Sequence, residues 1–286
     1  MSGIIIIGGG PAGVSAALYT ARAGIATTII ENGPLALAKA PLIENYYGAP
    51  ASGQGLYESG LRQAAAAGAS VINGEVIAAE YDRAFYVTLK GAEESLKSGV
   101  LLLATGAESA SLSLPGLQEL EGHGVSYCAV CDGFFFRKKR VAVLGSGAYA
   151  LHEADYLKQL AASVTVLTNG EDPQDAVRAG FETISSPLQA VHGENRLEAV
   201  SFADGSRLET DGLFIALGTA GSTDLARKLG AGVNGRFIAV KKDGSTNIPG
   251  LFAAGDCTGG IRQVAKAVCD GMYAGMAAVR YLRSKK

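Results

Sequence analysis

The stretch Ile4-Ile5-Ile6-Ile7-Gly8-Gly9-Gly10-Pro11-Ala12-Gly13 decides the fold of this chain. Four consecutive isoleucines are typical of a parallel strand that is buried on both faces. The residues that follow predict a helix over Val14–Ala23 and a second strand over Thr27–Ile30. This segment is therefore expected to form a βαβ unit, the building block of a Rossmann-like domain.

The glycine spacing Gly8-x-Gly10-x-x-Gly13 lies directly between the predicted strand and helix, with Pro11 and Ala12 inside it. The first glycine permits a tight turn, the second lets the backbone approach a pyrophosphate, and the third allows close packing of the helix. The alternative is a glycine-rich structural turn. Glu31 favours a dinucleotide site, because an acid at the end of the next strand can accept hydrogen bonds from a ribose hydroxyl.

A second unit of the same kind follows later in the chain. It has a strand over Val141–Leu144, a turn from Gly145 to Ala150, a helix to about Ala161 and a strand over Val164–Leu167. The predicted fold is therefore α/β, with two Rossmann-like dinucleotide-binding domains of the three-layer ββα type, the second inserted in the first. We expect a discontinuous first domain over 1–112 and 236–286, and a middle domain over 113–235.

Composition narrows the class of protein. The 286 residues are 48% hydrophobic with 39 glycines, which is typical of enzymes with many tight turns. The net charge of −2 argues against nucleic acid as a partner. Glycines, Pro11 and Arg22 interrupt the apolar N-terminal region, so no membrane segment or signal peptide is expected. We expect a cytoplasmic protein.

Cys128-Ala129-Val130-Cys131-Asp132 carries the chemistry of the middle domain. Two thiols at this spacing can close a disulfide and exchange with a partner disulfide, and Asp132 can transfer the proton that this exchange needs. The alternatives are half of a metal site or two inert buried thiols. Zinc needs about four such ligands, and no further ligands have a recognisable spacing, so no metal is expected.

Together these motifs resemble the low-molecular-weight thioredoxin reductases along nearly the whole chain. The resemblance lies in Gly8–Gly13, Ala104-Thr105-Gly106, Cys128–Phe135 and Gly250-Leu-Phe-Ala-Ala-Gly-Asp256. It implies FAD as cofactor, thioredoxin as partner and a homodimer. It also implies that Cys131 accepts electrons from the flavin while Cys128 attacks the partner disulfide, with Asp132 as the proton donor.

The resemblance further implies a set of FAD-binding residues in the first domain. Asp256 would bind the ribityl chain, although a strand-end aspartate beside glycines also suits a helix cap. Arg262, Gln263 and Val264 would lie against the isoalloxazine ring. The full set is Gly8, Gly10, Pro11, Ala12, Gly13, Glu31, Asn45, Thr105, Gly106, Gly255, Asp256, Arg262, Gln263 and Val264.

The second unit departs from the family where NADPH should bind. The family has an arginine-rich run at the end of the second strand, whereas this chain reads Thr168-Asn169-Gly170-Glu171-Asp172, with Arg178 as the first cation after it. Ala148-Tyr149 also places a bulky ring where a pyrophosphate is expected. NADPH binding is therefore doubtful, while Glu171 leaves NADH open.

A reductase-like chain without the NADPH motif resembles the ferredoxin-dependent flavin thioredoxin reductases. Ferredoxin is the expected electron donor, and Arg137-Lys138-Lys139-Arg140 is a candidate docking patch or simply a solvated turn. Three alternatives stay open. They are an FAD-dependent dithiol oxidase that uses oxygen, an NAD(P)H-dependent thioredoxin reductase with an atypical nucleotide site, and a redox sensor without turnover.

Overall fold

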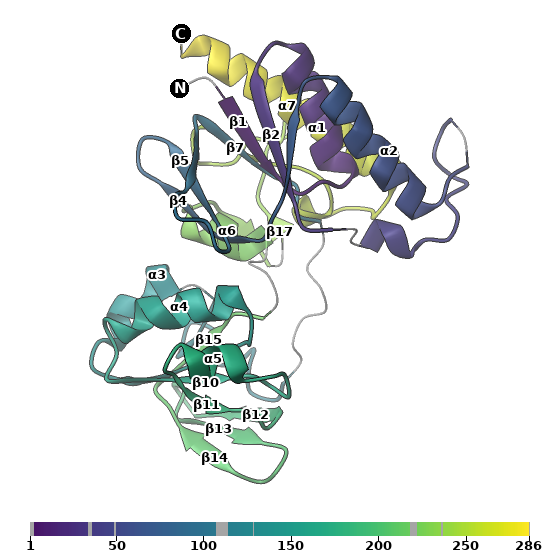
Figure 1. Ribbon diagram of the computed structural model, residues 1–286. Coiled ribbons are helices and arrows are strands. Elements are labelled where there is room, and N and C mark those ends of the chain that lie inside the picture. The colour runs from purple at the N-terminus through teal and green to yellow at the C-terminus, as the bar shows by residue number, and fades with distance from the viewer. Residues whose placement is uncertain are drawn as a thin grey trace. The chain divides into compact units, whose positions relative to one another are not determined.

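The computed structural model describes residues 3–33, 36–48, 50–106, 114–127, 129–217, 222–235 and 237–285 of the chain. The chain divides into two compact units, drawn in Figure 1. Unit 1 comprises residues 1–109 and 221–286, and unit 2 comprises residues 110–220.

Unit 1 is built on a five-stranded parallel sheet in the order β18-β7-β1-β2-β3. Helices α1, α2 and α7 lie side by side over it (Figure 1). A three-stranded antiparallel sheet, β4-β5-β6, contacts strand β1 through β6. The elements are β1 (Gly3–Ile7), α1 (Pro11–Arg22), β2 (Ala26–Glu31), η1 (Ala36–Lys39), α2 (Gly53–Ala66), β3 (Ser70–Asn73), β4 (Val76–Tyr81), β5 (Phe85–Leu89), β6 (Leu96–Ser98), β7 (Val100–Leu103), α6 (Ser222–Lys228), β16 (Val233–Asn234), β17 (Phe237–Ile238), β18 (Leu251–Ala253), η3 (Asp256–Thr258) and α7 (Val264–Ser284).

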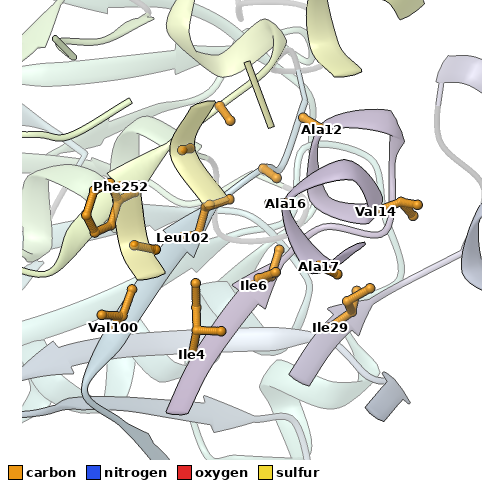
Figure 2. Close-up of a cluster of buried hydrophobic side chains, with 14 of the residues drawn as sticks. Ile4, Ile6, Ala12, Val14, Ala16, Ala17, Ile29, Val100, Leu102 and Phe252 are labelled. Atoms are coloured by element: carbon orange, nitrogen blue, oxygen red, sulfur yellow. The ribbon is translucent and has the colours of Figure 1, made fainter. Parts of the chain in front are cut away.

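The core of unit 1 lies between this sheet and the helices. Figure 2 shows alternate strand residues, such as Ile4 and Ile6 of β1, pointing toward Ala16 and Ala17 of α1. Small residues on α1 and α7 let the two helices pack closely: a Cβ on Gly271 would lie 2.1 Å from the carbonyl oxygen of Ala12. The four isoleucines are all buried, as the sequence predicted for a strand covered on both faces.

Unit 2 repeats the plan. Its parallel sheet has the order β11-β10-β9-β15-β8, and a second sheet, β12-β13-β14, packs on one face while α4 packs on the other (Figure 1). The elements are β8 (Val125–Ser126), α3 (Ala129–Asp132), η2 (Gly133–Phe136), β9 (Arg140–Leu144), α4 (Ala148–Lys158), β10 (Ser163–Leu167), α5 (Gln174–Arg178), β11 (Glu182–Ile184), β12 (Leu188–His192), β13 (Ala199–Phe202), β14 (Arg207–Glu209) and β15 (Gly212–Ile215). Two sheets and a helical layer in each unit give the predicted three-layer α/β fold.

The second domain boundary differs from the sequence-based one. The sequence placed residues 222–235 in the middle domain, whereas the structure places them in unit 1. The reason is packing: α6 contacts β4, β16 and β17, all in unit 1. No local pattern marks this return to the first unit.

The helices of the described ranges include none that is both long and apolar enough to cross a membrane.

Candidate FAD and dithiol site

The turn between β1 and α1 has the geometry that its glycines predict. A Cβ on Gly8, whose φ is 114°, would lie 2.2 Å from the carbonyl oxygen of Ala104. A Cβ on Gly13 would lie 1.9 Å from the carbonyl oxygen of Gly8. At Gly10, by contrast, a Cβ would meet open space. Two of the glycines are thus required by the fold, whereas Gly10 leaves room for a ligand.

The N-terminus of α1 suits an anion. Gly10 is the N-cap residue, Pro11 opens the helix, and among the described residues no side chain caps it and no acid lies in its first turn. The amide groups and the positive end of a helix dipole together attract phosphate. This turn therefore fits the pyrophosphate of a dinucleotide such as FAD.

Glu31 is the last residue of β2, where the sequence placed it, and its side chain is only 8% exposed. One carboxylate oxygen accepts hydrogen bonds from the backbone N–H of Gly33 (2.8 Å) and from the hydroxyl of Tyr57. The other accepts a 2.7 Å hydrogen bond from Nδ2 of Asn73. Burial, followed by the hydrogen bond to Glu31, raises the pKa of Tyr57 above its ordinary value. Sequence reasoning missed Tyr57 and Asn73, because they follow no motif.

The three motifs of the first unit meet at the carboxyl edge of one sheet. The backbone N–H of Ala104 bonds to Ile7 and that of Ala254 bonds to Leu103, so the ends of β1, β7 and β18 are adjacent. Thr105 and Gly106 follow β7, and Gly255 and Asp256 follow β18. Ligands of open parallel sheets bind at this edge.

The loop after β18 touches the phosphate-binding turn directly. A Cβ on Gly255, whose φ is 85°, would lie 2.9 Å from Cβ of Ala12. This close approach brings Asp256 next to the start of α1. The helix-cap alternative for Asp256 does not hold, because α7 begins at Val264 and its N-cap residue is Gln263.

Asn45 and Gln263 come together although 218 positions separate them. Nδ2 of Asn45 donates a 2.9 Å hydrogen bond to Oε1 of Gln263, and both side chains are exposed. Arg262 is exposed beside them, and Val264 is the first residue of α7. The predicted flavin-binding residues of this region therefore form one surface of unit 1.

The dithiol segment of unit 2 is described in part. Cys128 lies outside the described residues, and of Cys131 only its place in α3 is described. The backbone N–H of Ala129 donates a 2.9 Å hydrogen bond to the buried carboxylate of Glu153 on α4. The hydroxyl of Ser126 donates a 2.6 Å hydrogen bond to Asp132. Sequence reasoning missed both Glu153 and Ser126, which fix the two ends of this short helix.

Aromatic and basic side chains follow α3. Phe134 and Phe135 are 65% and 69% exposed. The guanidinium of Arg137 lies over the Phe134 ring, and the ammonium of Lys139 lies over the Phe136 ring. An exposed aromatic surface of this kind, directly after the predicted dithiol segment, suits a protein partner.

One of the four basic residues of Arg137–Arg140 is paired with acidic side chains. Arg140 pairs with Glu209 at 2.8 Å and with Asp211 at 3.3 Å. These hydrogen bonds raise the pKa of Arg140 above its usual value. The positive charge of the patch therefore comes from Arg137, Lys138 and Lys139, all of them exposed.

Each unit contains the same backbone hydrogen bond at its glycine turn, and this bond identifies equivalent positions in the two units. The N–H of Gly8 bonds to the carbonyl of Ile30, and the N–H of Gly145 bonds to the carbonyl of Leu167. The residue after the accepting carbonyl is thus Glu31, the last residue of β2, in unit 1 and Thr168, which follows β10, in unit 2. Thr168 is buried, and its hydroxyl donates a 2.7 Å hydrogen bond to the carbonyl of Glu171. The position equivalent to Glu31 in unit 2 therefore carries a hydroxyl, which donates its hydrogen bond within its own turn.

Two other residues in or near this turn also interact with neighbouring residues of unit 2. Oδ1 of Asn169 accepts a 2.7 Å hydrogen bond from the N–H of Leu188. The exposed Arg178 interacts with Gln174 and Asp175 of its own helix. Tyr149, whose ring the sequence places where a pyrophosphate is expected, is completely buried inside unit 2.

Three further observations complete the site. Cys257 is buried, its thiol donating to the carbonyls of Leu103 and Ala254, and burial raises its pKa to about 12. Cys269 is exposed. The described part of the chain contains no group of three His, Cys, Asp or Glu side chains that could hold a metal ion.

Comparison with known proteins places this geometry in a family. Residues 2–271 match the family model described as pyridine nucleotide-disulphide oxidoreductase. The thioredoxin reductase of Listeria monocytogenes is 34% identical over 306 aligned positions, which cover 99% of this chain and 94% of that protein. The thioredoxin reductase of Treponema pallidum is 35% identical, with 98% and 96% covered.

The solved structures that resemble this chain are also thioredoxin reductases. The atypical thioredoxin reductase from Desulfovibrio vulgaris Hildenborough is 38% identical, with a TM-score of 0.93 and with 100% of this chain and 99% of that chain covered. A ferredoxin-flavin thioredoxin reductase from Clostridium acetobutylicum is 31% identical, with a TM-score of 0.74 and coverage of 99% and 98%. The chain therefore belongs to the pyridine nucleotide-disulphide oxidoreductase family, as a thioredoxin reductase-like flavoprotein disulfide reductase with FAD as its cofactor.

Proposed function

We propose that this protein reduces the disulfide of a thioredoxin through Cys128 and Cys131, and that its electrons come from a reduced ferredoxin rather than from NADPH. The proposal of a thioredoxin substrate is supported by the relatives that carry that name. The observation that carries the donor proposal is the turn after β10.

That turn offers little to a nicotinamide nucleotide. Thr168 replaces the acid that would bind a ribose, and its hydroxyl is already engaged. Residues 168–172 supply no cation for a 2′-phosphate, and they add the carboxylates of Glu171 and Asp172. A phosphate dianion is held by neutralising donors, so these charges oppose NADPH. Glu171 is exposed and lies three residues past the equivalent of Glu31, which also weakens the case for NADH.

The chain's own groups complete the exchange chemistry. FAD, when bound and reduced by two ferredoxins that each give one electron, would supply the electron pair. Two electrons and two protons convert the Cys128–Cys131 disulfide into two thiols. Cys128, as thiolate, then attacks the thioredoxin disulfide, and Cys131 displaces the mixed disulfide to release the reduced thioredoxin. Asp132, held by Ser126, donates the proton to the departing thiolate.

Two surfaces of unit 2 support protein partners. Phe134 and Phe135 offer an exposed aromatic contact for thioredoxin immediately after the dithiol segment. Arg137, Lys138 and Lys139 offer positive charge to an acidic ferredoxin, since complementary charges speed encounter. We expect these partners in the reducing cytoplasm, where dithiol exchange enzymes act.

We also propose a homodimer. Tyr273 and Met276 are 49% and 43% exposed and lie one helical turn apart on α7, and Tyr19 of the adjacent α1 is 42% exposed. Large apolar side chains on neighbouring helices suit an interface between copies. Light scattering on the purified protein measures the mass, and a monomer would contradict this assignment.

The donor is tested with the purified holoprotein under anaerobic conditions. NADPH, NADH or a reduced ferredoxin is mixed in turn with the protein, and the flavin absorbance is followed together with reduction of added thioredoxin. We expect rapid bleaching with ferredoxin only. Rapid bleaching by NADPH would overturn the donor proposal, while turnover with oxygen and a small dithiol would favour a dithiol oxidase. Bleaching without any thioredoxin reduction would favour a sensor.

A further inference from the structure

Lys266 lies at the centre of the loop that carries Asp256. Its ammonium donates hydrogen bonds to the carbonyl oxygens of Gly255 (2.9 Å) and Gly259, with the hydroxyl of Thr258 farther away at 3.4 Å. The carboxylate of Asp270, one turn along α7, lies 2.7 Å from the same ammonium. A lysine ammonium has three N–H donors, so two carbonyls and one carboxylate use them fully.

The loop needs this cation for an electrostatic reason. Gly255 and Gly259 have φ values of 85° and 84°, and these turns direct their carbonyl oxygens toward one point. Carbonyl oxygens that converge in this way repel one another unless a donor lies between them. Asp270 completes the arrangement, because the N–H of Gly255 donates to it at 3.2 Å. Both sides of the Gly255 residue are therefore held by the Lys266–Asp270 pair.

The same loop is anchored from inside by Cys257, whose thiol donates to Leu103 and Ala254. Asp256 lies in the chain between Gly255, whose carbonyl accepts from the Lys266 ammonium, and the buried Cys257. The side chains of Lys266 and Asp270 are 20% and 29% exposed, which makes their interaction stronger than one on an open surface.

We propose that Lys266 is a positioning residue for FAD, which fixes the loop Gly255–Gly259 so that Asp256 is presented to the cofactor beside the phosphate-binding turn. The inference rests on the assignment of Asp256 to the FAD site. It predicts that removal of the ammonium weakens FAD binding through Asp256, without loss of the fold of unit 1.

The test measures FAD release from full-length holoprotein by the gain in flavin fluorescence on serial dilution. The variants are Lys266→Met, Asp256→Asn and the double variant. Lys90→Met is the matched control, because Lys90 pairs with Glu75 at 3.5 Å elsewhere in unit 1. We expect Lys266→Met and Asp256→Asn each to raise the dissociation constant about tenfold or more, as loss of a charge-assisted interaction does. The double variant should exceed Asp256→Asn by less than about twofold, since residues that act together are not additive.

The outcomes distinguish an error in the role of Lys266 from an error in the assignment of the FAD site. If Lys266→Met retains the affinity of Lys90→Met, or if its effect multiplies with that of Asp256→Asn, Lys266 does not act through Asp256 and the inference is wrong. If Asp256→Asn has no effect, the assignment of the FAD site is wrong instead. Should Lys266→Met fail to fold, Lys266→Gln retains a donor for one carbonyl and is judged by the same cycle. Donor specificity plays no part in this measurement.

Discussion

Gly10 and Gly13 belong to one motif, yet the structure predicts opposite consequences for their substitution by alanine. At Gly13 the new Cβ would lie 1.9 Å from the carbonyl oxygen of Gly8. Carbon and oxygen rest about 3.3 Å apart, so the start of α1 would have to move by about 1.4 Å. Overpacking against backbone costs about 2–3 kcal/mol after the gain in helix propensity. At about 2–4 °C for each kcal/mol, the melting temperature should fall by about 5–10 °C.

Gly10→Ala should leave the fold almost unchanged. The backbone at Gly10 has φ −75° and ψ −176°, which alanine adopts without strain, and its Cβ would meet open space. The free energy of unfolding should therefore change by less than about 1 kcal/mol. FAD binding, however, should weaken about tenfold or more, because the Cβ blocks the approach of the pyrophosphate to the backbone.

The assay compares both variants with the parent protein, stripped of FAD, by thermal unfolding followed by FAD titration. The reasoning is refuted if the two stripped variants melt at the same temperature. It is also refuted if Gly10→Ala binds FAD as tightly as the parent protein.

Three further outcomes are expected. Glu31→Gln should lower the free energy of unfolding by about 1.5–3 kcal/mol in urea unfolding, because an amide cannot accept from all three donors that surround the carboxylate; an unchanged midpoint would contradict the hydrogen-bond assignment. In a Cys128→Ser, Cys131→Ser double variant at pH 8, an alkylating reagent should label Cys269 alone until the protein unfolds, since Cys257 is buried with its pKa raised to about 12; two labels by mass spectrometry on the folded protein would disprove this. Replacement of Phe134 and Phe135 by serine should raise the KM for thioredoxin about tenfold and leave flavin reduction unchanged, and equal loss of both in steady-state and rapid-mixing kinetics would argue against a docking role.

Much of the fold could be predicted because its signals are local. The isoleucine run and the glycine turn each act within a few residues. The structure has β1 at that run and α1 over Pro11–Arg22, where the sequence predicted a helix over Val14–Ala23. The same holds for β9 and β10 in unit 2. For the antiparallel sheets β4–β6 and β12–β14 the sequence predicted no individual strands, because these strands are short and partly exposed. Only the three-layer fold class implied such a layer.

The sequence by itself determined the α/β class, the two dinucleotide-type units, the motifs for FAD and the position of the dithiol. Only the tertiary structure decided which side chains surround those motifs. Tyr57 and Asn73 reach Glu31, and Lys266 reaches Gly255, across separations without any periodic pattern. The return of the chain to unit 1 at α6, and the equivalence of Thr168 with Glu31, likewise follow from packing and hydrogen bonds between distant segments. A motif is written in neighbouring residues, whereas its environment is assembled from residues that only the folded chain brings together.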